Sequence, residues 1–353
     1  MFALCTGIAV IFLHYGPTSS DRPYRKAQKI DAYAHPIHDK QITTRTDQHQ
    51  HGHYLRTPKT PSDDTNTDHH YFDAIVVGSG LAGLSTTLEL LDRGGKVALV
   101  EKEATLGGNS LKASSGMNAC CEKEDTEPEF IQDTTKSAGD LARPPMIHEL
   151  VSSSASALQW LQTRVGVDLS QIAQLGGHSH ARTHRPSEGM VGAELIVHLE
   201  MLVQTYQTKT TDNVSVEGQV TIFTDSPVTQ ILQHGDQIRG VQILHGGNNS
   251  TILQAPQVVL ATGGFASDRR PNSLLSKVRP DLLHFGTTGG SFSTGDGISL
   301  ATQLGANTVD MEEIQLHPTG FVDPNNPADG IKVLAAELLR GVGGILLNRY
   351  GER

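Results

Sequence analysis

The sequence has few cysteines and no excess of positive charge. Its three cysteines, two of them adjacent, do not form the pattern of a disulfide framework. The 38 aspartates and glutamates outnumber the 28 lysines and arginines, and the net charge of −10 argues against a nucleic-acid-binding surface. No C-x-x-C-H haem-attachment motif occurs, which excludes a c-type cytochrome within these 353 residues.

Long apolar runs are also absent. The run Phe2–Leu13 is shorter than the about 20 residues of a membrane-spanning helix, but it has the length of a signal-peptide core. No basic residue precedes it, whereas Arg22, Arg25 and Lys26 follow it. We interpret residues 1–15 as an apolar leader that serves as a signal or as a membrane anchor. The alternative is an N-terminal stretch that has no targeting function. The leader predicts a mitochondrial or endoplasmic reticulum location, and without it we expect a cytoplasmic protein that has no contact with a membrane.

Residues 16–70 are polar and have no sustained periodicity, which predicts a disordered linker. His49, His51 and His53 have a spacing that suits metal chelation. No carboxylate or cysteine is placed to complete a ligand set, so we expect no metal site there or elsewhere.

The chain is rich in glycine, with 36 residues, and its clearest glycine motif follows a short apolar run. Ala74–Val77 predicts a strand, and the next six residues, Gly78–Gly83, match G-x-G-x-x-G. A helix is expected from Ala82, and a second strand, Lys96–Val100, ends at Glu101. Strand, glycine turn, helix and acid in this order predict a nucleotide-binding unit rather than an ordinary strand-to-helix connection.

Each motif glycine has a separate expected role. Gly78 allows the tight turn, Gly80 lets the backbone approach a pyrophosphate, and Gly83 lets the helix pack close to the strand. The helix N-terminus then offers unpaired N–H groups and the positive end of its dipole to the phosphates. Glu101 is placed to accept hydrogen bonds from ribose hydroxyls.

The residues after Glu101 form a long stretch of small and hydroxyl side chains, from Lys102 to Asn118. Small side chains let backbone N–H groups approach a large flat ring, and we predict that this loop does so. A glycine- and serine-rich surface connection is the alternative.

Periodicity predicts the remaining framework. Helices are expected over 146–165, with Leu150, Leu158, Trp160 and Leu161 in the core, and over 192–207, with Leu195, Leu199 and Leu202 on one side. Short strands are expected at 220–223, 227–233, 237–244 and 251–253, as an inserted antiparallel meander, and a buried strand at 257–261. Residues 294–297 are expected to open a helix over 298–304.

A segment rich in histidine and arginine, 176–186, precedes the second of these helices. His178 and His180 have metal-ligand spacing, but Arg182 and Arg185 would repel a cation. We therefore predict that this loop faces an anion.

In their order and number, these motifs resemble the flavoprotein subunits of the fumarate reductase and succinate dehydrogenase family, and most closely its soluble fumarate reductases. The motifs are V77-GSGLAG-L84, E101-K102, G107-GNS, A113-SSGMN, A261-TGGF, T294-GDG, H317-PT and E337-LLRG. The resemblance implies an α/β fold, with a Rossmann-like FAD-binding domain that contains the antiparallel meander and with the start of a clamp domain. We assign residues 71–311 to an incomplete FAD-binding domain and residues 312–353 to a truncated clamp domain.

The resemblance also implies the cofactor site. FAD is expected to be noncovalent, because Gly108–Gly116 lacks the histidine that carries covalent flavin in membrane-bound members. The implied FAD-binding residues are Gly78, Gly80, Leu81, Ala82, Gly83, Glu101, Lys102, Gly108, Asn109, Ser110, Ser114, Ser115, Gly116, Val228, Ala261, Thr262, Gly263, Thr294, Gly295 and Asp296.

The implied reaction is hydride transfer from reduced flavin to fumarate, which gives succinate; the electron donor is not assigned. His317, Ser115 and Glu337 are the implied substrate-binding residues, and Glu337 with Arg340 the implied proton relay. The chain stops before the segment that carries the proton-donating arginine of the family, so the alternative is a noncatalytic flavin-binding remnant. Relatives that act on other unsaturated acids, aspartate or ketosteroids give further alternative substrates.

Overall fold

The computed structural model describes residues 11–13, 70–120, 124–207, 218–246, 249–341 and 343–353. The predicted leader and linker therefore lie outside the described residues, apart from Ile11–Leu13 and His70. Within the described part of the chain, no helix is both long and apolar enough to cross a membrane.

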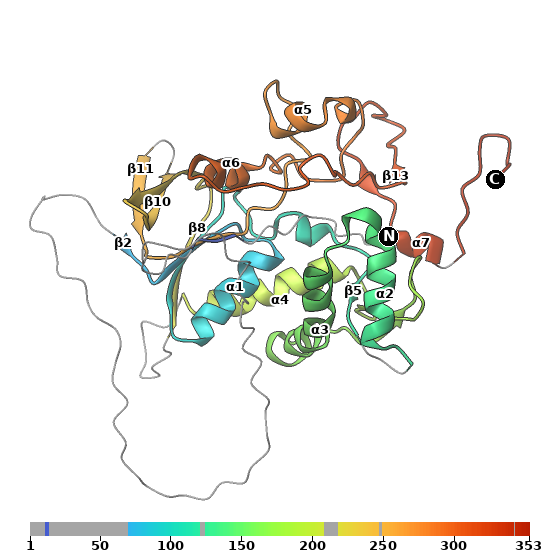
Figure 1. Cartoon of the computed structure of the whole chain (residues 1–353), viewed down its shortest axis with the longest axis horizontal. Helices are drawn as coiled ribbons and strands as arrows, with labels where there is room; N and C mark the ends of the chain where they lie inside the picture. The colour runs from blue at the N-terminus through green and yellow to red at the C-terminus, as the bar shows by residue number, and fades with distance from the viewer. Residues whose placement is uncertain (1–10, 14–69, 121–123, 208–217, 247–248, 342) are drawn as a thin grey trace, which may run out of the picture. The chain divides into compact units, whose positions relative to one another are not determined.

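A five-stranded sheet forms the centre of the fold (Figure 1). Its order is β1 (Ile11–Leu13), β12 (Val258–Leu260), β3 (Ala74–Val77), β4 (Lys96–Val100) and β8 (Gln219–Phe223). The last four strands are parallel, whereas β1 pairs antiparallel with β12. The predicted α/β fold and the two strands that flank the glycine motif are thus confirmed.

Both faces of this sheet are buried, which explains why its strands are apolar at successive positions. Side chains alternate between the two faces along a strand. Val76 and Leu99 belong to the cluster on the face covered by helices α1 (Leu81–Asp92) and α4 (Val191–Thr205). Ile75 and Val100 belong to the cluster on the opposite face.

The opposite face is covered by a second sheet and by helix α6 (Asp296–Gln303). The order of this sheet is β2 (His70–Tyr71), β11 (Asn249–Gln254), β10 (Gln237–His245) and β9 (Val228–His234). The antiparallel run β9–β10–β11 confirms the predicted meander.

The assignment of residues 220–223 to the meander was wrong. That strand, β8, pairs in parallel with β4 in the central sheet. A short β-rich segment gives no local sign of its partner, because pairing is decided by contacts between residues far apart in the sequence.

A third sheet has the order β5 (Met117–Asn118), β7 (Thr183–Arg185) and β6 (Gln171–Ala173), with α2 (Glu127–Ala138) and α3 (Pro144–Trp160) as the helices of this region. A π-helical turn, Leu161–Val165, continues α3. Leu158 and Leu161 are buried as predicted, but Leu150 is 48% exposed and does not belong to the core. Ile147 and Val151 occupy the buried face of α3 instead.

Cys120 follows β5, is buried and forms a disulfide. The sequence pattern did not predict this bond.

Apart from α6, the elements described from residue 274 onward are short. They are α5 (Leu274–Val278), a 3-10 turn (Pro280–Leu282), the strand pair β13 (Gly320–Phe321) and β14 (Val333–Leu334), and α7 (Glu337–Gly341). The predicted boundary between an FAD-binding domain and a clamp domain near residue 311 stays a prediction.

Candidate functional site

A cavity of about 890 Å³, its open mouth included, lies where β3, β4 and β12 end. The register of the parallel strands brings their carboxyl ends to one edge, with Val77 opposite both Val100 and Leu260. This edge is where open α/β sheets bind ligands.

The residues that line the cavity come from five segments, 77–82, 100–110, 226–228, 261–263 and 292–300. They are Val77, Gly78, Ser79, Gly80, Leu81, Ala82, Val100, Glu101, Lys102, Gly108, Asn109, Ser110, Ser226, Val228, Ala261, Thr262, Gly263, Phe292, Ser293, Asp296 and Leu300.

The glycine motif builds the floor of the cavity. Gly78 has φ +99°, and a Cβ there would lie 2.5 Å from the carbonyl oxygen of Ala261. A Cβ on Gly83 would lie 1.8 Å from the carbonyl oxygen of Gly78, so only glycine lets α1 start this close to β3. These contacts match the roles expected for the turn and the helix packing.

The N-terminus of α1 opens toward the cavity. No side chain of its own caps the helix at Gly80. Instead Leu81 donates its N–H to Ser110 Oγ at 3.0 Å. First-turn N–H groups have no acceptor within a helix, so this end is suited to an anion, with the Ser110 hydroxyl beside it.

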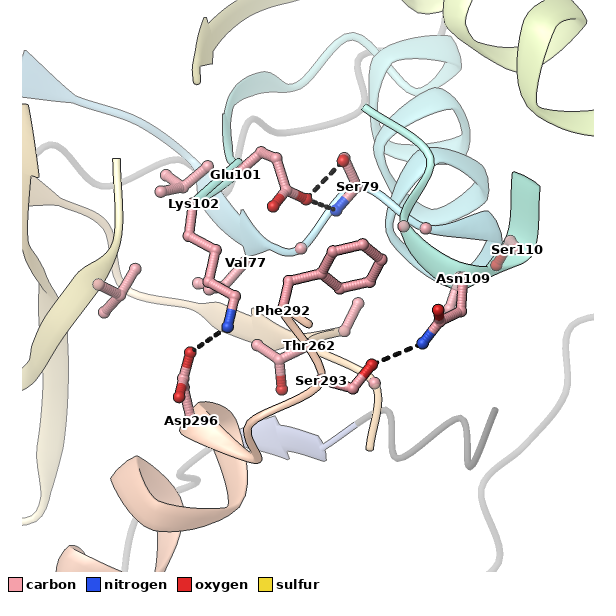
Figure 2. A pocket seen from close by; sticks show the side chains of 18 of the residues that line it. Val77, Ser79, Glu101, Lys102, Asn109, Ser110, Thr262, Phe292, Ser293 and Asp296 are labelled. Carbon is pink, nitrogen blue, oxygen red and sulfur yellow. Dashed lines mark hydrogen bonds and ion pairs between the residues drawn. The ribbon is translucent and has the colours of Figure 1, made fainter. Parts of the chain in front are cut away.

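Glu101 is fixed at the end of β4 by three hydrogen bonds, and those from Ser79 are drawn in Figure 2. Its Oε2 accepts the N–H of Ser79 at 3.0 Å and the hydroxyl of Ser79 at 2.6 Å. Its Oε1 accepts the N–H of Glu103 at 3.0 Å. The carboxylate is 8% exposed and lines the cavity, which makes it an oriented acceptor for hydroxyl groups.

Lys102 and Asp296 neutralise each other across the cavity (Figure 2). Lys102 Nζ lies 2.6 Å from Asp296 Oδ2 and donates to Thr294 Oγ1 at 2.7 Å. Thr294 in turn donates to Asp296 Oδ1 at 2.7 Å. These three residues bring the start of α6 to the end of β4.

Asn109 links two loops that flank the cavity. Its Nδ2 donates to Ser293 Oγ at 2.6 Å, and its Oδ1 accepts the N–H of Gly290 at 2.7 Å. Between these two loop residues, Phe292 places its ring in the cavity wall (Figure 2). The same loop is joined to the C-terminal part, because Thr287 exchanges backbone hydrogen bonds with Gly330 and Lys332.

Most of the implied FAD-binding residues line this cavity, but six do not: Gly83, Ser114, Ser115, Gly116, Thr294 and Gly295. Gly83 packs against Gly78, and Thr294 binds Lys102 and Asp296, so both contact residues that line the cavity. Gly116 packs against β7, where a Cβ would lie 2.6 Å from Thr183 Cγ2.

Sequence reasoning missed seven lining residues: Val77, Ser79, Val100, Ser226, Phe292, Ser293 and Leu300. Ser79 is part of the glycine motif, and Phe292 and Ser293 directly precede the T294-GDG motif. A position within or next to a recognised motif could therefore have indicated that these three residues line the cavity.

The implied substrate residues His317 and Glu337 do not line the cavity. His317 Nδ1 lies 2.7 Å from the carbonyl oxygen of Thr319, and Thr319 Oγ1 donates to the carbonyl oxygen of Ala335. The N–H of Thr319 lies 3.3 Å from the same Nδ1, so both backbone groups of Thr319 hold the ring at this nitrogen. Glu337 is buried, and its carboxylate lies 3.3 Å from the Cβ position of Gly176. The side chain of Arg340 lies outside the described residues.

The loop predicted to face an anion binds acids of the protein itself, so that prediction was wrong for Arg182 and His180. Arg182 is fully buried, with Asp125 at 2.6 Å and Asp133 at 2.8 Å. His180 lies 3.0 Å from Glu129. Burial opposes ionisation of Asp133, but hydrogen bonds from Ser179 and Arg182 outweigh it and lower its pKa.

The cavity fits FAD on three observations of the structure. The glycine turn leaves no side chain between the backbone and a ligand at Gly78 and Gly80, the first turn of α1 offers N–H groups to a pyrophosphate, and Glu101 offers an oriented carboxylate to a ribose.

Comparison with known proteins agrees with this geometry. The model of the FAD binding domain family matches residues 73–353. The chain is 39% identical to fumarate reductase of Schizosaccharomyces pombe, over 79% of this chain and 55% of that protein. It is 39% identical to fumarate reductase 1 of Saccharomyces cerevisiae, over 78% of this chain and 58% of that protein.

Among solved structures, the open conformation of a flavocytochrome c3 fumarate reductase superimposes with a TM-score of 0.66 and 28% identity. The match covers 80% of this chain and 48% of that chain. The chain thus spans about half the length of the relatives it matches.

Proposed function

The chain belongs to the FAD-binding flavoprotein family of fumarate reductase and succinate dehydrogenase, and from this premise we propose that it holds FAD noncovalently and serves the reduction of fumarate to succinate. The observation that carries the proposal is the cavity at the carboxyl edge of the central sheet, where Glu101 and the N-terminus of α1 lie together.

Each group of lining residues has a part of the cofactor to hold. The N–H groups of the first turn of α1 and the Ser110 hydroxyl bind the pyrophosphate, while Glu101 accepts a hydrogen bond from the adenosine ribose. Lys102 is paired with Asp296 and contributes no net positive charge, so the phosphates depend on backbone donors.

Noncovalent attachment is supported by the chemistry of the cavity wall. Among the described lining residues there is no histidine, cysteine or tyrosine; the nucleophilic side chains are serine and threonine hydroxyls and one ion-paired lysine. The loop 108–116 likewise contains no histidine.

Bound FAD supplies the hydride. The part of the chain that would meet the substrate is 312–341, which backbone hydrogen bonds of Thr287 join to the cavity loop. His317 is the proposed partner of a fumarate carboxylate: its Nδ1 is held at the backbone of Thr319, which leaves Nε2 to donate a hydrogen bond to the carboxylate. Glu337, buried beside Gly176, is the proposed proton carrier together with Arg340.

Replacing His317 by alanine is expected to raise the KM for fumarate about tenfold or more, because a hydrogen bond to a charged group is lost. FAD content should not change, since His317 lies outside the cavity lining. The measurement is anaerobic oxidation of the reduced flavin by fumarate in the full-length protein.

His148→Ala serves as the matched control, because His148 is exposed on α3 and far from these elements in sequence. An unmodified protein whose reduced flavin is not oxidised by fumarate would overturn the proposed substrate. Equal KM values for the unmodified protein and His317→Ala would remove His317 from substrate binding.

A further inference from the structure

Ser79, the middle residue between Gly78 and Gly80, joins three segments of the cavity wall. It is fully buried. Its N–H and hydroxyl both donate to Glu101 Oε2, at 3.0 and 2.6 Å. Gly107 donates its N–H toward Ser79, 3.1 Å from the carbonyl oxygen and 3.2 Å from Oγ. The glycine turn, the end of β4 and the loop after Glu101 therefore meet at this serine.

These contacts limit what Glu101 can still accept. A carboxylate has about four acceptor positions, two on each oxygen. Ser79 occupies both positions on Oε2, and the N–H of Glu103 occupies one on Oε1. One acceptor position, on Oε1, is left for a ligand.

The adenosine ribose presents two neighbouring hydroxyls, at C2′ and C3′. A carboxylate that binds both hydroxyls needs two open acceptor positions, and Glu101 has one. We propose that Ser79 is a positioning residue that closes Oε2 and thereby restricts Glu101 to a single ribose hydroxyl. This inference rests on the proposed FAD binding, but not on the reaction with fumarate.

The test is equilibrium binding of apoprotein to FAD and to two FAD analogues that lack either the 2′- or the 3′-hydroxyl of the adenosine ribose. One analogue is expected to bind about tenfold more weakly than FAD or worse, because its partner was a charged acceptor. The other should bind within about threefold of FAD, in the range of a weak or solvent-facing contact. Losses of tenfold or more for both analogues would overturn the inference.

Ser79→Ala tests the positioning role itself. The substitution opens a position on Oε2, so the second hydroxyl gains an acceptor, and the affinity ratio between the two analogues should fall below about threefold. Ser154→Ala is the matched control: it removes another buried hydroxyl, which accepts the N–H of Cys120 and does not touch Glu101, and should leave the ratio unchanged.

A ratio in Ser79→Ala equal to that of the unmodified protein would contradict the positioning role even if the overall affinity fell. Failure of the inference is distinguishable from failure of the proposed function. An unmodified protein that binds no FAD refutes the function, whereas FAD binding with equal affinities for the two analogues refutes only the role of Ser79.

Discussion

Arg182→Met is expected to lower the free energy of unfolding by about 3–5 kcal/mol, the cost of leaving a buried charge without its partner. The substitution keeps an unbranched apolar stem and removes the charged guanidinium. Asp125, whose side chain is fully buried, and Asp133 would then lack their cation. The contact of the guanidinium with the Phe130 ring, at 4.5 Å, is lost as well.

Arg164→Met provides the control, because Arg164 also binds a carboxylate through two nitrogens but near the surface. Its side chain is 33% exposed and that of its partner Asp92 is 25% exposed. Exposed ion pairs contribute about 1 kcal/mol or less. The free energy of unfolding of the unmodified protein and of both variants is measured by urea denaturation, with the same excess of FAD in each sample. A loss for Arg182→Met no larger than that for Arg164→Met would show that the buried cluster does not stabilise the fold.

Glu101→Ala is expected to weaken FAD binding about tenfold to a hundredfold, the range for a lost hydrogen bond to a charged acceptor. The carboxylate lines the cavity, whereas the Glu103 side chain does not. Only the backbone N–H of Glu103 contacts Glu101, and Glu103→Ala preserves that group. Glu103→Ala is therefore the matched control and should bind FAD within about twofold of the unmodified protein.

Both affinities are measured by titrating apoprotein with FAD and following the flavin fluorescence. Equal losses in the two variants would mean that the carboxylate of Glu101 does not contact the ribose.

The nucleotide-binding unit could be predicted from the sequence because its determinants are local. β3, the glycine turn, α1 and β4 follow each other between Ala74 and Val100, and a side chain at Gly78 or Gly83 would collide with the backbone of this unit or of Ala261. The consecutive apolar residues of β3 and β4 indicate strands buried on both faces, as found.

The sequence-based predictions that were wrong concern contacts between segments far apart in the sequence. Residues 220–223 were assigned to the meander because their pairing with β4 bridges more than a hundred residues. Arg182 was expected to face a ligand because Asp125 and Asp133, which neutralise it, belong to a segment some 50 residues earlier. A short sequence segment shows its own charge and hydrophobic periodicity, but it does not show which distant residues it will contact in the fold.

The cavity residues that the sequence missed follow the same rule. Ser79 lies within the recognised motif, but its hydroxyl gains a role only through Glu101, 22 residues away. Phe292 and Ser293 reach the cavity because Asn109, from the other wall, binds the loop that carries them. Their contribution depends on how two loops meet, which no single stretch of sequence specifies.

Binding of FAD without a covalent bond is tested most directly by acid precipitation of the purified protein, followed by absorption spectra and quantification of flavin in pellet and supernatant. We predict a yellow supernatant that contains about one FAD per chain, because the cavity wall offers serine and threonine hydroxyls but neither histidine nor cysteine among its described residues. Flavin that stays in the precipitated protein would contradict noncovalent binding, and a protein that neither carries nor rebinds FAD would contradict the cavity as its site.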